Sequence, residues 1–102
     1  MNLRSIERKI NIREKTYNIS GKSILLTGRI PKYTRTTIEQ KIIQLGGFIY
    51  SQRYDADIVV YTKTDSTKYI RAKNASIYKK SMLFISGEEF IKKYLKFEVD
   101  NE

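Results

Sequence analysis

The sequence predicts an α/β fold built on a parallel sheet that helices cover on both faces. Short, β-prone apolar segments alternate with segments in which apolar residues recur at helical spacing. The strand segments are apolar at consecutive positions, which is typical of parallel strands buried on both faces. With 102 residues the chain is at most one domain, and we expect the element order β-α-β-β-α-β-α within it.

The first half of the predicted domain contains two strands joined by a helix. Ile24-Leu25-Leu26 forms the first strand and residues 48–50 the second. Thr34 is the expected N-cap of the helix, because its side-chain oxygen can accept a bond from a first-turn N–H. Gly46 is the expected C-cap, because glycine adopts a positive φ without strain. Residues at i, i+4 and i+7 give this helix one apolar face: Ile38, Ile42 and Leu45.

The third strand is predicted at residues 57–61, where Ile, Val and Tyr have high β propensity. Asp65 or Ser66 then caps a second helix that runs through Ala72. Asp55 and Asp57, two positions apart, are the one pair of carboxylates that resembles a metal site. No third carboxylate is evident nearby, so we interpret them as the start of the third strand and expect no metal or other cofactor.

The fourth strand is predicted at residues 82–85, followed by a last helix. Ser86 and Glu89 match the S-x-x-E capping box that begins a helix. The apolar stripe of this helix consists of Phe90, Ile91, Tyr94 and Leu95. The chain thereby divides into a basic N-terminal arm (1–20), a folded domain (21–97) and an acidic tail (98–102).

Composition excludes several classes of function. The chain has no Cys and no His, which rules out disulfides, Cys/His zinc sites and catalysis by Ser-His or Cys-His pairs. No apolar stretch approaches the roughly 20 residues that span a bilayer, and the N-terminus lacks the apolar block of a signal peptide. We therefore expect a cytoplasmic protein, in a bacterial or viral context, or a nuclear one.

Charge indicates a polyanionic partner. The chain contains twenty basic and eleven acidic residues, which gives a formal net charge of +9. The alternative is mutational drift, since the abundance of Ile, Lys, Asn and Tyr is typical of an A+T-rich coding sequence. No Walker-type loop, no nucleophile beside a base and no paired acid is present, so we do not expect an enzyme.

The residues at the ends of these elements resemble a known family. The strand ending in Thr27-Gly28, the pair Gly46-Gly47, the closing Ser86-Gly87-Glu88-Glu89-Phe90 and the order of elements together resemble a BRCT domain over residues 21–96. The resemblance implies a four-stranded parallel sheet in the order 2-1-3-4, flanked by three helices. Two departures are that Phe90 stands where many members have Trp, and that residues 74–82 form a longer stretch.

Within the family the chain is most similar to the single BRCT domains of bacterial NAD-dependent DNA ligases and of the large subunit of the eukaryotic clamp loader. Those domains carry Thr-Gly at the end of the first strand, Arg eight residues after that Thr, and Ser-Lys or Thr-Lys at the start of the second helix. The matching positions here are Thr27-Gly28, Arg35 and Thr67-Lys68. In the clamp-loader type these residues hold the 5′-phosphate of a DNA end, so the resemblance implies phosphate binding by Thr27, Gly28, Arg35 and Lys68.

Physical chemistry favours the same anion site. A cation in the first turn of a helix is unfavourable because the helix N-terminus is itself positive, yet Arg35 and Lys68 both stand near a predicted helix start. A bound phosphate would resolve both conflicts. We therefore expect two helix starts and the tip of the first strand to converge, with no carboxylate to offset the positive charge. Each residue also has a structural interpretation, as a strand end, a turn glycine or a solvated helix residue.

Further basic and aromatic residues extend the candidate site toward a DNA backbone: Arg29, Lys32, Tyr33, Arg4, Arg8 and Lys9. The leading hypothesis is a non-catalytic DNA-binding module that recognises phosphorylated ends or nicks in replication or repair. The alternative is a module that binds a phosphopeptide or another protein of replication or repair. A third hypothesis is a scaffold, or a fragment of a DNA ligase, whose anion site is unused.

Overall fold

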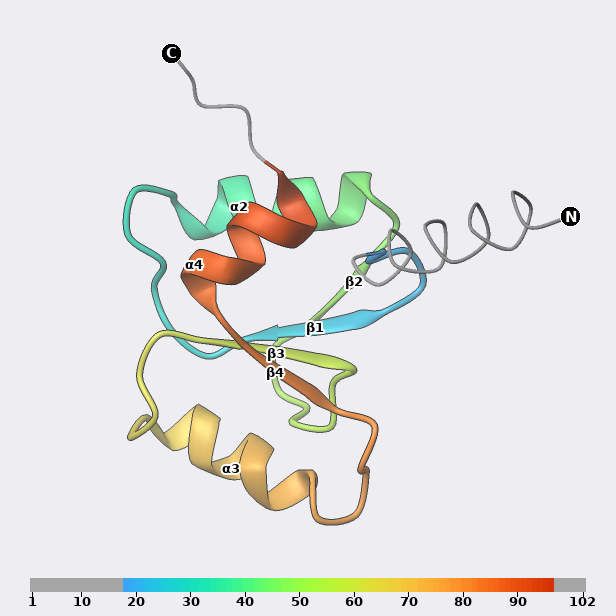
Figure 1. The fold of residues 1–102 in the computed structure, drawn as a ribbon, viewed down its shortest axis with the longest axis vertical. Coiled ribbons are helices and arrows are strands. Elements are labelled where there is room, and N and C mark those ends of the chain that lie inside the picture. The colour runs from blue at the N-terminus through green and yellow to red at the C-terminus, as the bar shows by residue number, and fades with distance from the viewer. Residues whose placement is uncertain (1–17, 97–102) are drawn as a thin grey trace, which may run out of the picture.

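The structure, a computed structural model, describes residues 18–96 and consists of four strands and three helical segments (Figure 1). The elements follow the predicted order: β1 (Ser23–Leu26), α2 (Arg35–Gln44), β2 (Phe48–Tyr50), β3 (Ile58–Tyr61), α3 (Thr67–Ala75), β4 (Leu83–Ser86) and α4 (Gly87–Phe90), which continues directly as the π-helix η1 (Ile91–Leu95). The predicted tail, most of the predicted arm and the arm residues Arg4, Arg8 and Lys9 lie outside the described residues.

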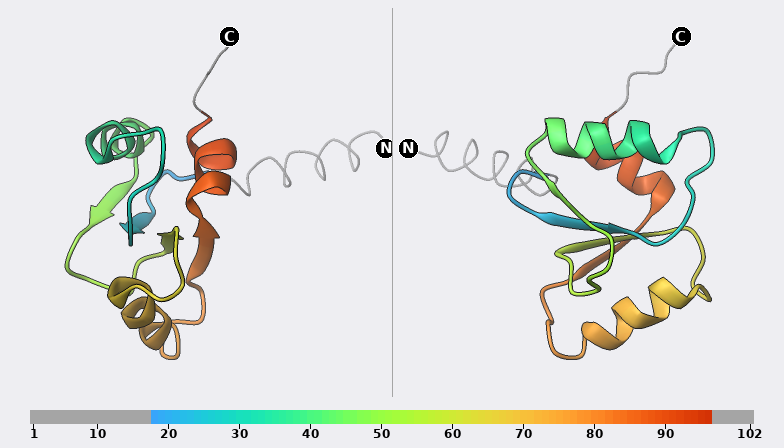
Figure 2. Two further views of the ribbon diagram at one scale, coloured as in Figure 1. Left: turned by 90° about the vertical axis from the view of Figure 1, so that its left-hand side faces the viewer. Right: turned by 180° about the vertical axis from the view of Figure 1, so that it is seen from behind.

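The four strands form one parallel sheet in the order β2-β1-β3-β4, as predicted. In the register of the sheet, Ile24 of β1 stands between Ile49 of β2 and Ile58 of β3. Helices α2 and α4 cover one face of this sheet, and α3 covers the other (Figures 1 and 2). None of the helices in residues 18–96 has the length and apolar character needed to cross a membrane.

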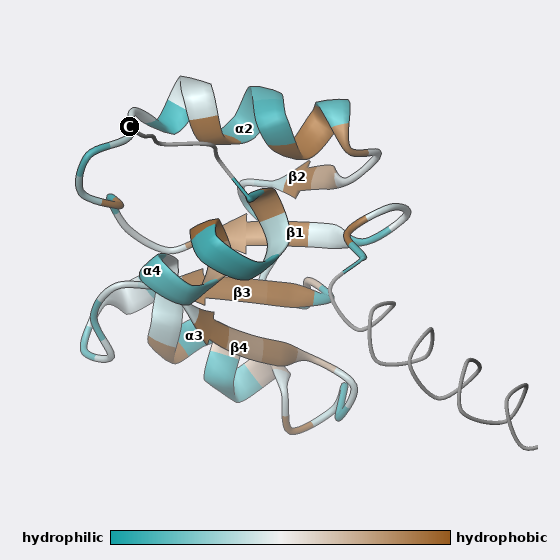
Figure 3. Cartoon of the chain, turned by 45° about the horizontal axis from the view of Figure 1, so that its top comes forward, coloured by the Kyte–Doolittle hydropathy of each residue, from teal (hydrophilic) through white to brown (hydrophobic). Residues whose placement is uncertain are grey.

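The two covered faces explain why the strands are apolar at every position. Alternate residues of a strand point to opposite faces, so Ile24 and Leu26 pack beneath α2 and α4, whereas Leu25 packs against Ala72 of α3. The larger core joins strand residues to the helices above them: Ile24, Leu26, Ile58, Val60, Ile38, Ile42, Phe90, Ile91, Tyr94 and Leu95. In Figure 3 the strands form a brown band, and most of the teal lies in helices and loops.

The predicted helix starts are confirmed. The hydroxyl of Thr34 accepts from the Thr37 N–H at 3.2 Å. The hydroxyl of Ser66, one of the two candidate caps, accepts from the Tyr69 N–H at 3.1 Å and so caps α3. Ser86 caps α4 in the same way, and the predicted stripe of the last helix is buried.

Two details of the helices differ from prediction. Helix α3 runs three residues beyond Ala72, to Ala75. Leu45 is not part of the apolar face of α2, because it is the C-cap and its side chain is 36% exposed. The backbone of Leu45 departs from helical geometry (ψ 3°), so its side chain does not continue the row formed by Ile38 and Ile42. Gly46 follows with φ +91°, as expected of a glycine that ends a helix.

Candidate anion site at the carboxyl edge of the sheet

The strand order places the carboxyl ends of β1 and β3 side by side, where their connections leave the sheet on opposite faces. From β1 the chain crosses to β2 through α2 on one face, and from β3 it crosses to β4 through α3 on the other face. The two connections therefore diverge at this point, and in open α/β sheets ligands bind where such a divergence occurs. Figure 1 shows both connections on the same side of the molecule, the teal loop before α2 and the yellow loop before α3.

Thr27 stands at this edge of the sheet, directly after β1. Its side chain is buried, and both its N–H and its hydroxyl donate to the carbonyl oxygen of Val60, at 2.9 and 3.1 Å. The hydroxyl proton is therefore used to fasten β1 to β3, and the remaining lone pairs only accept bonds. For this hydroxyl to donate to a phosphate oxygen, it must first turn away from Val60.

Gly28, after β1, lies close to Thr62, after β3. A Cβ at Gly28 would lie 2.6 Å from Thr62 Oγ1, so any larger residue would displace that hydroxyl. Within residues 18–96 no group accepts a hydrogen bond from the Gly28 N–H, which leaves this donor available to a ligand. Thr62 is not among the predicted site residues, although it follows β3 as Thr27 follows β1, and the parallel pairing of these strands brings the two positions to one edge.

Arg35 is the first residue of α2 and reaches back over the end of β1. Its Nη2 donates to the carbonyl oxygen of Leu26 at 3.2 Å, while its Nη1 lies 3.8 Å from Glu39 Oε2. The expectation that no carboxylate offsets the positive charge is therefore wrong at Arg35. The pair with Glu39 is an exposed i, i+4 pair, which is worth only about 0.3–0.5 kcal/mol, so the guanidinium can exchange it for a phosphate.

Gly28 and Arg35 line a hollow of about 660 Å³ in the loop between β1 and α2. Its wall also includes the predicted backbone-contact residues Arg29, Lys32 and Tyr33. It thus combines three cations with no carboxylate in the wall itself, and we call it the basic hollow: Leu26, Gly28, Arg29, Ile30, Pro31, Lys32, Tyr33, Thr34, Arg35 and Ile38.

Lys68 does not line the basic hollow. It is the second residue of α3, on the opposite face of the sheet, although α3 begins at the same edge as α2. No hydrogen bond or ion pair joins its side chain to Thr27, Gly28 or Arg35 in the part of the chain that the structure describes. The structure therefore groups Thr27, Gly28 and Arg35 around the end of β1, and convergence of Lys68 on the same anion stays a prediction.

The described chain begins at the other edge of the sheet. The N–H of Gly21 donates to the carbonyl oxygen of Gly46 at 2.9 Å, beside the amino end of β1. Four strand residues separate this point from Thr27, a distance of about 13 Å at 3.3 Å per residue. Any contact of Arg4, Arg8 or Lys9 with DNA at the basic hollow must span that distance.

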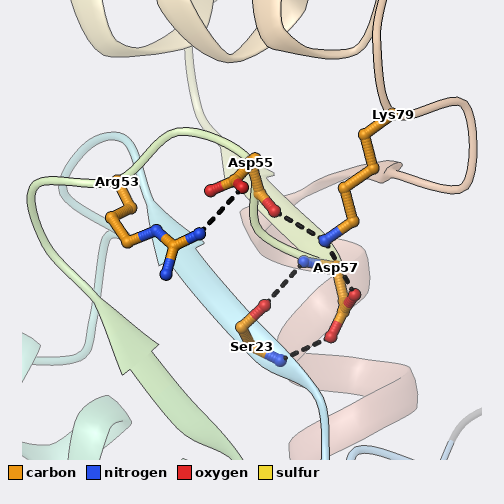
Figure 4. A network of polar contacts seen from close by, with 5 residues as sticks. All are labelled: Ser23, Arg53, Asp55, Asp57 and Lys79. Atoms are coloured by element: carbon orange, nitrogen blue, oxygen red, sulfur yellow. Dashed lines mark hydrogen bonds and ion pairs between the residues drawn. The ribbon is translucent and has the colours of Figure 1, made fainter.

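Asp55 and Asp57 lie at that amino edge as well, where each carboxylate has a protein partner (Figure 4). Asp57 accepts from the Ser23 N–H at 2.9 Å and pairs with Lys79 Nζ at 3.1 Å, and these two contacts, in this order of size, lower its pKa. The hydrogen bond from the Arg53 guanidinium, at 3.0 Å, lowers the pKa of Asp55. The carboxylate of Asp57 fastens the starts of β1 and β3, and that of Asp55 pairs with Arg53 in the loop before β3. Residues 18–96 contain no cluster of three or more potential metal ligands.

Comparison of the chain with models of protein families, with curated proteins and with solved structures finds no match in any of the three. The sheet order agrees with the layout that the resemblance to BRCT domains implies. Membership of that family stays a prediction that rests on the residues quoted for it.

Proposed function

We propose that this chain is a non-catalytic DNA-binding module that recognises the 5′-phosphate of a DNA end or nick. The observation that carries the proposal is the basic hollow, which lies at the end of β1, beside the edge where the strand order predicts a ligand. It contains three cations and the available N–H of Gly28. A terminal phosphate, with up to two negative charges, complements such a wall better than an internal phosphodiester with one.

Three kinds of donor support phosphate as the ligand. The guanidinium of Arg35 can bind two phosphate oxygens at once. The first N–H groups of α2 have no partner within the helix, as at any helix start, and they point toward the same edge. Charge-assisted bonds from these groups are about twice as strong as neutral ones.

DNA is favoured over a phosphopeptide by the spread of positive charge beyond one phosphate. Arg29 and Lys32 continue the basic wall along the loop, and the formal net charge of the chain is +9. Contacts with neighbouring phosphates make binding fall steeply with salt, with a slope of about −0.9 per phosphate neutralised.

The test compares two duplexes that differ only in a 5′-phosphate or 5′-hydroxyl, by fluorescence anisotropy at several salt concentrations. We expect the phosphorylated end to bind at least about 10-fold more tightly, the value of one charge-assisted bond. Arg35→Gln should remove most of that preference, whereas Arg71→Gln, which deletes the same charge from the exposed Arg71 of α3, should retain it.

Lys68 has a matched control of its own residue type. Lys68→Gln should weaken binding of the phosphorylated end, and Lys80→Gln, near the amino end of β4, should leave the phosphate preference unchanged. Equal binding of the two duplexes contradicts the proposal. Binding of a phosphoserine peptide without measurable DNA affinity would instead favour a phosphopeptide-binding module.

A further inference from the structure

A second hollow of about 950 Å³ adjoins the basic hollow, between the β1–α2 loop and α4. The two share four consecutive wall residues, 30–33. We call it the mixed hollow, and its remaining wall comes from the ends of β3 and β4 and from the last helix: Tyr61, Thr62, Ser86, Gly87, Glu88, Glu89, Ile91, Lys92 and Lys93.

The two hollows differ in charge. The basic hollow has cations and no carboxylate in its wall. The mixed hollow brings in Glu88 and Glu89 beside Lys92 and Lys93, and Glu89 Oε2 lies 3.6 Å from Lys93 Nζ. With the shared Lys32, the wall of the mixed hollow has three cations and two carboxylates, whereas the basic hollow has three cations and no carboxylate. A phosphate is therefore favoured in the basic hollow.

The uncharged part of the mixed hollow suits a nucleoside. Tyr33 contributes a partly buried aromatic ring, and Thr62 and Ser86 contribute hydroxyls. The ring of Tyr61 instead packs against Tyr69 of α3, with 5.2 Å between the ring centroids. Bases stack on aromatic side chains with little regard to sequence, and carboxylates accept bonds from exocyclic amino groups. The volume lies within the range of about 300–1,000 Å³ that is typical of small-molecule sites.

The contact between Gly28 and Thr62 joins the two hollows. Gly28 lines the basic hollow and Thr62 the mixed one, and a Cβ at Gly28 would stand only 2.6 Å from Thr62 Oγ1. A phosphate bound at Gly28 would therefore lie next to the space beside Thr62, and a nucleoside in that space would adjoin its own 5′-phosphate.

We propose that the mixed hollow receives the nucleoside that carries the 5′-phosphate, detached from its complementary base. This inference rests on the proposed function and narrows its substrate to 5′-phosphorylated ends whose terminal nucleotide is unpaired, as in a frayed or mismatched end. The terminal base stacks on a tyrosine of the hollow while the phosphate stays in the basic hollow.

The test uses 5′-phosphorylated duplexes of equal length that end in a paired nucleotide, a mismatched nucleotide or an abasic site. We expect the mismatched end to bind about 5- to 150-fold more tightly than the abasic end, the range contributed by one base stacked on an aromatic side chain. The paired end should bind more weakly than the mismatched end, because its base must first be unpaired.

Two variants keep the test specific to the hollow. Tyr33→Leu should abolish the preference for the mismatched end, and Thr62→Val, which retains the volume of the side chain, should reduce it. Tyr78→Leu, at a side chain that is 90% exposed, is the matched control and should retain it. Circular dichroism of each variant confirms that the fold is preserved.

The failures of the two proposals are distinguishable. Equal binding of the mismatched and abasic ends, with a preserved preference for 5′-phosphate, overturns this inference and leaves the proposed function standing. Loss of the preference for 5′-phosphate on every duplex overturns both.

Discussion

Replacing Asp57 by Asn tests how the amino edge of the sheet is held together. The carboxylate of Asp57 accepts from the Ser23 N–H at 2.9 Å and pairs with Lys79 at 3.1 Å, so it joins β1, the start of β3 and the segment before β4 (Figure 4). Asn keeps the shape of the side chain and one acceptor oxygen, but it removes the charge from both contacts.

The expected loss in the free energy of unfolding is about 1–2 kcal/mol. A hydrogen bond to a charged group contributes about 1 kcal/mol more than a neutral one. The ion pair with Lys79 adds at most about 1 kcal/mol, because the two side chains are 34% and 39% exposed and water screens them. For a domain of this size, 1 kcal/mol lowers Tm by about 4–8 °C.

The measurement is urea unfolding at pH 7 and at lower pH, with Asp55→Asn as the control. Asp55 bonds an exposed Arg53 and connects no two strands, so its variant should lose clearly less stability. Because the pKa of Asp57 is lowered in the folded state, its contribution is complete above its ordinary value of 3.8 and is lost as the pH falls through the lower folded value. The difference between wild type and Asp57→Asn should therefore close as the pH falls below about 3.8, and equal losses in the two variants at pH 7 would refute the reasoning.

Three other changes in stability follow from the structure and are measurable by the same urea titration. Gly46→Ala should lower the free energy of unfolding by about 1–3 kcal/mol, and by more than Gly21→Ala. Both glycines have a positive φ, but only at Gly46 would the new Cβ meet another residue, Ser20, at 3.0 Å. Equal losses in the two variants would contradict this. Phe90→Ala should cost about 3–5 kcal/mol, since its side chain is fully buried, and Tyr78→Ala at a 90% exposed side chain should cost less than about 0.5 kcal/mol. Ser66→Ala should cost about 1 kcal/mol by removing the cap of α3, and an unchanged urea midpoint would show that the cap contributes nothing.

The layout of the fold could be predicted because its signals are local. Consecutive apolar residues such as Ile24-Leu25-Leu26 fit only a strand covered on both faces, and the two cores now show why. The helix starts could be predicted because Thr34 and Ser86 bond N–H groups three residues ahead, within the same segment of chain. The prediction that Leu45 belongs to the apolar face of α2 was wrong, because helical spacing does not indicate the residue at which a helix ends.

The candidate site could be predicted only in part, because its geometry depends on long-range packing. Thr27, Gly28 and Arg35 are within nine positions of one another, and the structure brings them together at the end of β1. Thr62 and Glu39 have no distinctive sequence pattern, and their relevance follows from the pairing of β1 with β3 and from the direction in which Arg35 reaches. Lys68 begins a helix on the other face of the sheet, and spacing along the chain does not tell whether its side chain reaches the end of β1.

The segment of residues 30–33 forms a common wall of the basic and mixed hollows and contains Lys32, whose φ is +77°. A ligand on either side restrains the same few backbone torsions, so the entropy lost in ordering this wall is lost once and serves both ligands. Occupation of one hollow should therefore change the affinity of the other, and linkage requires that the factor be the same in both directions. The binding free energies of an isolated phosphate and an isolated nucleoside should therefore add up to less than the binding free energy of the intact nucleotide.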